Sequence, residues 1–243
     1  MRWRPGLSNQ PMHSEVFASS GDASGAGVAL ALACDALSME KQAKAADPLA
    51  EAGERKQILW IQDREAIRLS GRPYHHGLPS ELRCRVVHVA AKTTQDALFA
   101  LEEGVRCRDF AFVIGELVGN PRVLDFTASR RLSLTAEKHG VPLWLVRLDA
   151  CADLSSARMR WRVRPAASFR SRWNSQAPGK SAWHAELFRA RMHAPGEWIL
   201  SNENGRNGQG KLGVERPNRQ RSAISPDSCD LVRTTVGRSL AAL

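Results

Sequence analysis

Short apolar runs and segments of helical spacing alternate along the first two thirds of the chain. Each run is four to six residues long, and those at 58–61, 110–115 and 142–146 are typical of buried strands. The predicted strands are Glu15–Ala18, Ile58–Ile61, Arg85–Val89, Phe110–Gly115 and Pro142–Val146. The predicted helices between them are Gly25–Leu37, Thr93–Cys107 and Pro121–His139, with Thr93 as an N-terminal cap and Gly140 at the C-terminal end. This alternation predicts an α/β fold with crossover helices and a mostly parallel sheet.

Two segments interrupt this pattern. Residues 39–56 are charged and rich in alanine, and we expect a variable linker there that is helical in part. Residues 69–79 contain two glycines and two prolines, which predicts a loop.

The pattern changes after residue 157, where arginine alternates with apolar residues in a single strand. Because successive side chains of a strand point to opposite faces, Arg158, Arg160, Arg162 and Arg164 share one face, and Met159, Trp161 and Val163 share the other. Residues 183–191 and 197–201 then predict an antiparallel hairpin. From Asn202 on, apolar residues are few, so residues 203–243 are predicted to be a disordered basic tail. Residues 1–12 are predicted to be a flexible N-terminus, which leaves residues 13–202 as one domain.

The charge of the chain is concentrated in its last third. The 243 residues carry a net charge of +10, yet residues 1–157 hold 19 Lys and Arg against 19 Asp and Glu. Residues 158–243 hold the remaining 16 basic and 6 acidic residues. Such a distribution suggests a globular part followed by a part that faces a polyanion or an acidic partner. The alternative is an arginine-rich tail that only keeps the chain in solution.

Composition excludes several classes of protein. Hydrophobic residues make up 43% and charged residues 25% of the chain, as in water-soluble globular domains. No apolar run approaches the roughly 18 residues that a membrane helix needs, so we expect a cytoplasmic protein without membrane contact. The five cysteines are scattered without a C-x-x-C pair, which predicts reduced thiols and no metal site. His75 and His76 have no further ligands at metal-binding spacing, so a solvated loop is the favoured interpretation.

The first strand leads into a small-residue loop and an apolar helix, which is the order of elements in a phosphate-binding loop. Such loops need a lysine for the phosphates and a Ser or Thr hydroxyl for magnesium. Here Gly25 is followed by Ala26 at the lysine position and Gly27 at the hydroxyl position. The sequence therefore predicts a degenerate loop, with no nucleotide cofactor and no ATPase activity. Glu116 follows a predicted strand where a magnesium-binding acid would lie, but without the lysine we favour an ordinary polar residue.

The order and spacing of these segments resemble the ImuA family of RecA-like accessory proteins in bacterial translesion synthesis. The resemblance covers roughly residues 12–202, and its most specific part is the helix 127–134 followed by the strand 141–146. The matching segments are residues 13–18, 58–63, 96–104, 113–117, 124–132, 141–147 and 160–163, with the strand around Trp198. The resemblance implies a RecA-like three-layer core without nucleotide hydrolysis.

The resemblance also implies partners and a process. The implied partners are an ImuB-like relative of Y-family polymerases and an error-prone DnaE-type polymerase, with RecA and DNA as further candidates. Together they copy DNA past lesions during the SOS response. The alternative is a SulA-like inhibitor of cell division that acts by protein binding, and an active RecA-like ATPase is a third class.

Two sets of residues are candidates for contact with DNA or a partner. The arginines at 158, 160, 162 and 164 could follow a phosphate backbone, or they could simply guard an exposed strand against edge pairing. Trp173 and Trp183 lie in a basic region and could stack on bases or anchor a partner, with ordinary packing as the alternative. We expect Trp60, Trp144 and Trp161 to lie in the core.

Overall fold

The protein is built on a single sheet, seen here in a computed structural model that describes residues 5, 12–45, 56–169, 179–204 and 210–215. The described strands lie in the order β3-β2-β4-β5-β1-β6-β7-β8-β9. Their bounds are β1 His13–Ala18, β2 Gln57–Asp63, β3 Val86–Ala91, β4 Phe110–Val118, β5 Leu143–Leu148, β6 Met159–Phe169, β7 Lys180–Ala190, β8 Gly196–Asn204 and β9 Gly210–Glu215. Strands β1 to β6 are parallel to one another, whereas β7 runs against β6 and β8, and β9 against β8. The expected mostly parallel sheet with antiparallel strands at its C-terminal end is confirmed.

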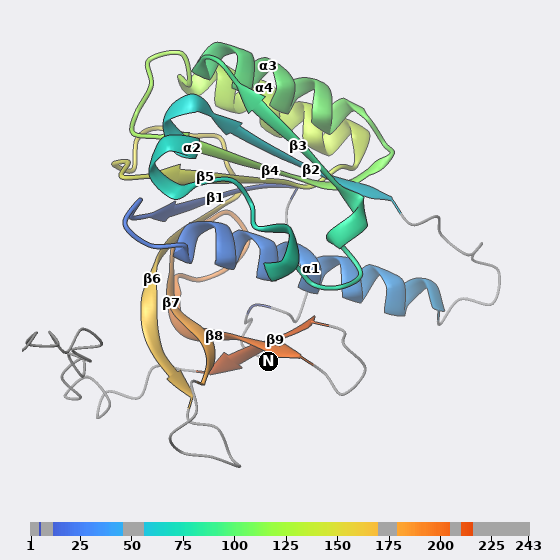
Figure 1. Cartoon of the computed structure of the whole chain (residues 1–243). Helices are drawn as coiled ribbons and strands as arrows, with labels where there is room; N and C mark the ends of the chain where they lie inside the picture. The colour runs from blue at the N-terminus through green and yellow to red at the C-terminus, as the bar shows by residue number, and fades with distance from the viewer. Residues whose placement is uncertain (1–4, 6–11, 46–55, 170–178, 205–209, 216–243) are drawn as a thin grey trace, which may run out of the picture.

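Helices cover both faces of the sheet, so the core has three layers (Figure 1). Helices α3 (Thr94–Arg106) and α4 (Phe126–His139) pack side by side on one face, and α1 (Ser24–Ala45) lies on the other. A short helix, α2 (Arg64–Ser70), follows β2, and 3-10 turns lie at His75–Gly77 and Arg83–Arg85.

The predicted helix ends at Thr93 and Gly140 are confirmed. The Thr93 hydroxyl accepts a hydrogen bond from the main-chain N–H of Asp96, and the Asp96 carboxylate accepts one from that of Thr93. This reciprocal pair satisfies two N–H groups at the start of α3. Gly140 ends α4 in the left-handed conformation, with φ 69°, which a residue without a Cβ adopts at no steric cost.

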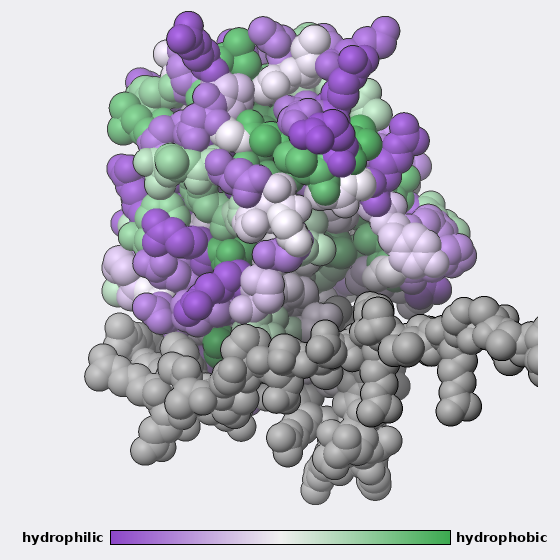
Figure 2. Space-filling model, turned by 60° about the vertical axis from the view of Figure 1, so that its left-hand side comes forward, coloured by the Kyte–Doolittle hydropathy of each residue, from purple (hydrophilic) through white to green (hydrophobic). Residues whose placement is uncertain are grey.

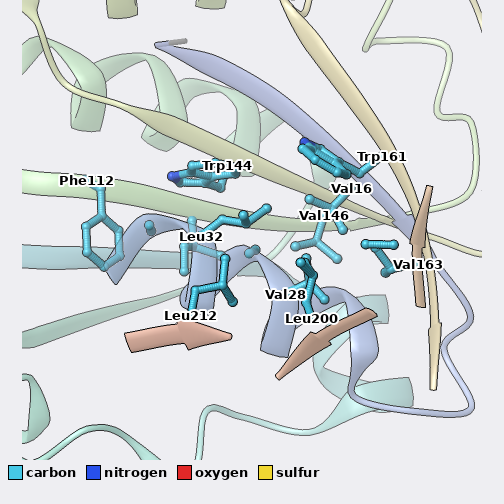
Figure 3. Close-up of a cluster of buried hydrophobic side chains, with 14 of the residues drawn as sticks. Val16, Val28, Leu32, Phe112, Trp144, Val146, Trp161, Val163, Leu200 and Leu212 are labelled. Carbon is cyan, nitrogen blue, oxygen red and sulfur yellow. The ribbon is translucent and has the colours of Figure 1, made fainter. Parts of the chain in front are cut away.

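Helix α1 is enclosed between the parallel part of the sheet and the C-terminal strands, which bend beneath it (Figure 1). Val28 and Leu32 lie between Trp144 and Val146 above them and Leu200 and Leu212 below them (Figure 3). A helix that is apolar on all sides is stable only when neighbours cover all of it. The enclosure therefore explains the Ala- and Leu-rich sequence of α1. The helix continues to Ala45, so residues 39–45 of the expected linker are helical, and 46–55 lie outside the described residues.

The predicted tail from residue 203 is wrong in its first part. Strand β8 continues to Asn204, and β9 pairs with it in an antiparallel register from Gly210 opposite Asn204 to Glu215 opposite Ile199. Leu212 is buried and Val214 half-buried against α1, and these side chains hold β9 in place. The folded domain therefore extends to Glu215, and residues 216–243 lie outside the described residues, as do residues 1–11 apart from Pro5.

Among the helices of the described residues, none combines the length and the apolar character that crossing a membrane would require.

Candidate functional site

The candidate phosphate loop lies where parallel α/β sheets usually bind ligands. Strand β1 is flanked by β5 on one side and β6 on the other, so the chain crosses from one side of β1 to the other after β5. Ligands of such sheets bind beyond the carboxyl ends of the strands at this kind of crossing point. Residues 19–23 connect β1 to α1 at that edge, beside the loop 149–157 that connects β5 to β6.

The start of α1 carries carboxylates in place of the groups that bind phosphate. The Asp22 carboxylate accepts a hydrogen bond from the main-chain N–H of Ser24 at 2.8 Å. Asp149 lies in the left-handed region, with φ 51°, and its carboxylate accepts from the main-chain N–H of Ser20 at 2.9 Å. Hydrogen bonds from Ser20 lower the pKa of Asp149, so this carboxyl is ionised at neutral pH. Helix N-termini attract anions, and here the Asp22 carboxylate occupies that position, while Asp149 binds the loop that precedes the helix.

The two glycines of the loop make room for packing. A Cβ at Gly25 would lie 2.7 Å from Cγ1 of Val146 and 2.9 Å from Cβ of Ala18, so glycine permits α1 to approach β1 and β5. A Cβ at Gly27 would lie 2.8 Å from Cζ2 of Trp183. The half-buried indole of Trp183, which reaches over from β7, thus packs directly on the first turn of α1. Trp183 contacts this turn of the helix, and Trp173 lies outside the described residues.

Arginine and apolar side chains alternate along β6 as predicted, but the face that carries the arginines is not uniformly exposed. Met159, Trp161 and Val163 are buried beside α1, as expected. On the opposite face, Arg160 is also buried, with 3% of its side chain exposed. Its Nε donates to the Glu15 carboxylate and its Nη1 to the Asp153 carbonyl, each at 2.7 Å. The expectation that this arginine contacts DNA or a partner is therefore wrong: it is part of the interior.

The other three arginines of this face differ in their surroundings. Arg158 forms a two-pronged ion pair with Glu137 of α4, at 2.7 and 3.1 Å, and this pairing lowers the pKa of Glu137. Arg162 donates to Glu186 of β7 at 2.7 Å, and 58% of its side chain is exposed. Arg164 is exposed and has no ion pair among the described residues. Arg160 alone among the four would lose a buried contact by reaching a ligand, and Arg162 and Arg164 are the two that are exposed.

Glu15 is the centre of a buried polar network that joins β1, β6, α4 and the loop 149–157. Arg147 lies on its other side at 3.8 Å and also contacts Asp153 at 3.5 Å. The Ser155 hydroxyl donates to Glu15 at 2.7 Å and bonds to the Ser129 hydroxyl at 2.9 Å. Buried charges need such partners because an unpaired one would be costly to keep out of water. The network fixes the loop beside the candidate phosphate loop.

The network could be anticipated only in part from the sequence. Glu15 is a charged residue inside an apolar strand, which is a signal that it is paired within the protein. Its partner Arg160 is 145 residues away, and alternation along β6 does not reveal that α4 and the loop 149–157 cover one end of the basic face. Asp22, two residues before α1, has the residue type of a helix cap.

Glu116 is buried within β4 and hydrogen-bonded inside the protein. It accepts from Nε1 of Trp60 at 2.6 Å and from Gln62 at 3.2 Å, and its second oxygen accepts from Ser70 at 3.3 Å. Burial raises the pKa of Glu116, although the three donors oppose this effect. These contacts agree with the interpretation of Glu116 as a polar residue that serves the fold.

Within the described residues, no three side chains of His, Cys, Asp or Glu gather in the manner of metal ligands. His75 and His76 are exposed in a 3-10 turn.

No family model and no curated protein matches the chain.

Proposed function

We propose that this protein is a non-catalytic, cytoplasmic RecA-like accessory subunit of an error-prone translesion synthesis complex. It acts through contacts with an ImuB-like polymerase relative and a DnaE-type polymerase, with RecA and DNA as further partners. The proposal combines the three-layer α/β core with the order of the segments that resemble the RecA-like ImuA family.

One observation carries the non-catalytic part of the proposal. The helix that would bind a nucleotide has the Asp22 carboxylate on the N–H of its first residue, Ser24. It has Ala26 and Gly27 in place of lysine and hydroxyl, and the indole of Trp183 is packed on Gly27. A phosphate there would meet negative charge and no ammonium group. Such a domain keeps the fold of a nucleotide-binding protein but does not hydrolyse nucleotide, and it functions by binding its partners.

The biochemical test is phosphate release by the purified full chain with ATP, magnesium and single-stranded DNA. We expect background release only. Turnover that a Glu116→Gln substitution abolishes would show instead that the domain is an active ATPase.

The cellular test is deletion of the gene followed by DNA damage. We expect fewer damage-induced mutations, normal growth without damage, and no further decrease when the partner polymerase is also deleted. An unchanged mutation frequency with altered filamentation would favour a SulA-like inhibitor of cell division. Purification of the tagged chain from damaged cells should recover the two polymerase-related partners together.

A further inference from the structure

The outer side of α4 carries large apolar side chains that are exposed and do not pack in the core. Its inner side is buried against the sheet through Ala128, Leu132 and Ala136. Phe126 and Leu134 lie eight residues apart and so fall on one side of the helix, with Arg130 between them. Phe126 is 41% and Leu134 50% exposed, and Arg130 is exposed as well. The result is a row with an apolar residue at each end and an arginine in the middle.

Neighbouring elements extend this row into a surface. Glu102 of α3 pairs with Arg131 of α4 at 2.6 Å, so Phe99, one turn before Glu102, lies on the part of α3 beside α4. Phe99 is 68% exposed. At the other side, the Ser129–Ser155 hydrogen bond places the exposed Leu154 next to the first turns of α4. We call these residues the α3–α4 surface: Phe99, Phe126, Arg130, Leu134 and Leu154.

The α3–α4 surface concentrates apolar exposure and interrupts it with charge. It contains four of the eight large hydrophobic side chains that the described residues expose. In Figure 2, the upper part of the molecule, where α3 and α4 lie, shows hydrophobic areas between strongly hydrophilic side chains. Grouped apolar exposure with a polar rim marks interaction surfaces, whereas single exposed apolar residues do not.

Among the described residues, the charged side chains of α3 and α4 that have no partner are positive. The acidic residues there are used within the molecule: Glu102 and Glu103 pair with Arg106, and Glu137 pairs with Arg158. Asp96 and Asp125 cap the starts of α3 and α4. Arg130 and Lys138 form no ion pair among the described residues. A partner that matches this surface must therefore bring carboxylates beside its apolar side chains.

The surface is held rigid from below. The Ser129 hydroxyl accepts from the main-chain N–H of Ser156 at 2.9 Å, and the Ser133 hydroxyl donates to the Ser156 carbonyl at 3.2 Å. The Ser133 hydroxyl also contacts Nδ1 of His13 on β1 at 2.7 Å. Rigid side-chain scaffolds lose less entropy when a partner binds.

We propose that the α3–α4 surface binds an acidic amphipathic helix of a partner protein. The apolar face of that helix packs on Phe99, Phe126 and Leu134, and its carboxylates pair with Arg130 and Lys138. This is the helix-on-helix mode of recognition, in which apolar side chains spaced by three and four give affinity and charge gives specificity. The proposal rests on the proposed function, because it assigns the surface through which that function reaches a partner.

The binding test uses two synthetic helical peptides and the full chain. One labelled peptide carries leucines on one face and glutamates on the other, and the second carries lysines in place of the glutamates. We expect saturable binding of the acidic peptide only. The double substitution Phe126→Ser with Leu134→Ser should weaken it about tenfold or more, and Arg130→Glu should weaken it most at low salt.

Tyr74→Ser supplies the matched control, because Tyr74 is 72% exposed and lies in the loop between α2 and β3, whose Glu81 pairs with Lys41 of α1 on the opposite face of the sheet from α4. It should bind the peptide as the wild type does. Circular dichroism should show that all variants are folded. The proposal is overturned if the acidic peptide does not bind, if the lysine peptide binds equally well, or if the double substitution leaves binding unchanged. It is also overturned if the double substitution only converts a dimer of this chain into monomers.

A complementation test separates this proposal from the proposed function. Cells that lack the gene receive the wild type, the Phe126→Ser with Leu134→Ser variant, or Tyr74→Ser, at equal protein levels. We expect only the double variant to leave damage-induced mutation low. If deletion lowers mutation but the double variant restores it fully, the docking surface is wrong and the proposed function stands. If deletion itself has no effect, the proposed function fails.

Discussion

Arg160 and Arg162 lie two residues apart on the same face of β6, but only Arg160 is enclosed by the protein. In the parallel pairing of β1 with β6, Arg160 lies opposite Glu15 and Arg162 opposite Phe17. The loop 149–157 covers the first position through the Asp153 carbonyl, and solvent reaches the second. Both guanidinium groups also contact the Phe188 ring, at 5.5 and 4.9 Å from its centre. Burial, more than residue type, therefore decides what each arginine does.

Substitution of these two arginines should have different effects on stability. Arg160→Gln leaves the Glu15 carboxylate buried with a weaker partner, and we expect the free energy of unfolding to fall by about 3–5 kcal/mol. Arg162→Gln breaks an ion pair whose arginine is mostly exposed, and we expect a change below about 1 kcal/mol. Urea denaturation of both variants measures the difference. Equal small losses would contradict the buried network, and tests of nucleic-acid binding should therefore change Arg162 and Arg164 only.

His13 gives the protein a specific sensitivity to acid. Its imidazole is fully buried on β1, and desolvation lowers its pKa from 6.5 to about 4. The unfolded chain therefore binds a proton at His13 at a higher pH than the folded chain does. Stability is consequently lost as the pH falls from about 6.5 toward 4, by up to about 3 kcal/mol.

The measurement is the free energy of unfolding at several pH values between 7 and 4.5. We expect the wild type to lose stability more steeply than a His13→Gln variant, whose side chain cannot ionise but can still bond to Ser133. His76→Gln, at an exposed position, is the control and should follow the wild type. Parallel pH curves for all three proteins would show that His13 does not dominate this range.

At the scale of elements, the Trp183 indole of β7 packs on Gly27 in the first turn of α1, the turn that would face the phosphate in a phosphate-binding loop. Gly27→Ala adds a methyl group that would lie 2.8 Å from the Trp183 ring, so the ring must move. We expect a loss of about 1–3 kcal/mol from this overpacking, although alanine favours the helix by up to about 1 kcal/mol. The Trp183→Leu background removes the ring, and there Gly27→Ala should stabilise the protein. A double-mutant cycle measures this reversal of sign, and an additive cycle would contradict the contact.

The sequence predicted the elements whose signals are local. The apolar runs of β1, β2, β4 and β5 and the caps at Thr93 and Gly140 depend on residues within a few positions of each other. Helix α2 is only seven residues long and begins at the Asp63 cap, so it lacks the length that makes helical spacing visible. Strand β9 contains only Leu212 and Val214 as apolar residues, between glycines and a lysine, and local propensity does not favour a strand there. It forms because β8 and α1 provide pairing and burial.

The candidate site could also be predicted only where its signals are local. Ala26 and Gly27 are visible in the sequence as departures from a phosphate loop. The burial of Arg160, the packing of Trp183 on Gly27 and the carboxylate of Asp149 depend on residues more than a hundred positions apart. Such contacts follow from the register of the sheet, which one sequence does not specify by pattern alone.

At the scale of the whole molecule, the C-terminal strands enclose α1 and thereby decide where the domain ends. The parallel sheet covers one side of α1, and strands β6 to β9 curve beneath the other (Figure 1). Leu200 and Leu212 complete the apolar contacts of Val28 and Leu32 (Figure 3). The residues after 202 thus include a part of the core, and the basic residues of the last third belong to two structural classes. Eleven belong to residues 158–215, on β6 to β9 or in the segments that adjoin them, and five lie beyond Glu215.

Two truncations separate these classes. A chain that stops after Glu203 lacks β9, exposes one side of α1 and loses the burial of Leu212, which alone contributes roughly 1.5–3 kcal/mol. We expect a lower midpoint of thermal unfolding and easier proteolysis. A chain that stops after Glu215 retains β9 and should unfold at the midpoint of the full chain. It lacks only residues 216–243, which hold five arginines and two aspartates.

Comparison of the two truncated chains with the full chain therefore distinguishes an effect on folding from an effect on binding. If the segment 216–243 contributes to binding of single-stranded DNA through its charge, the chain that ends at Glu215 should bind more weakly at low salt, and the difference should shrink as salt screens the charges. The chain that ends at Glu203 should be less stable at every salt concentration, because burial of Leu212 is not an electrostatic effect. Equal stability of the two truncated chains would contradict the assignment of β9 to the core, since it would mean that α1 does not need the strand that covers it.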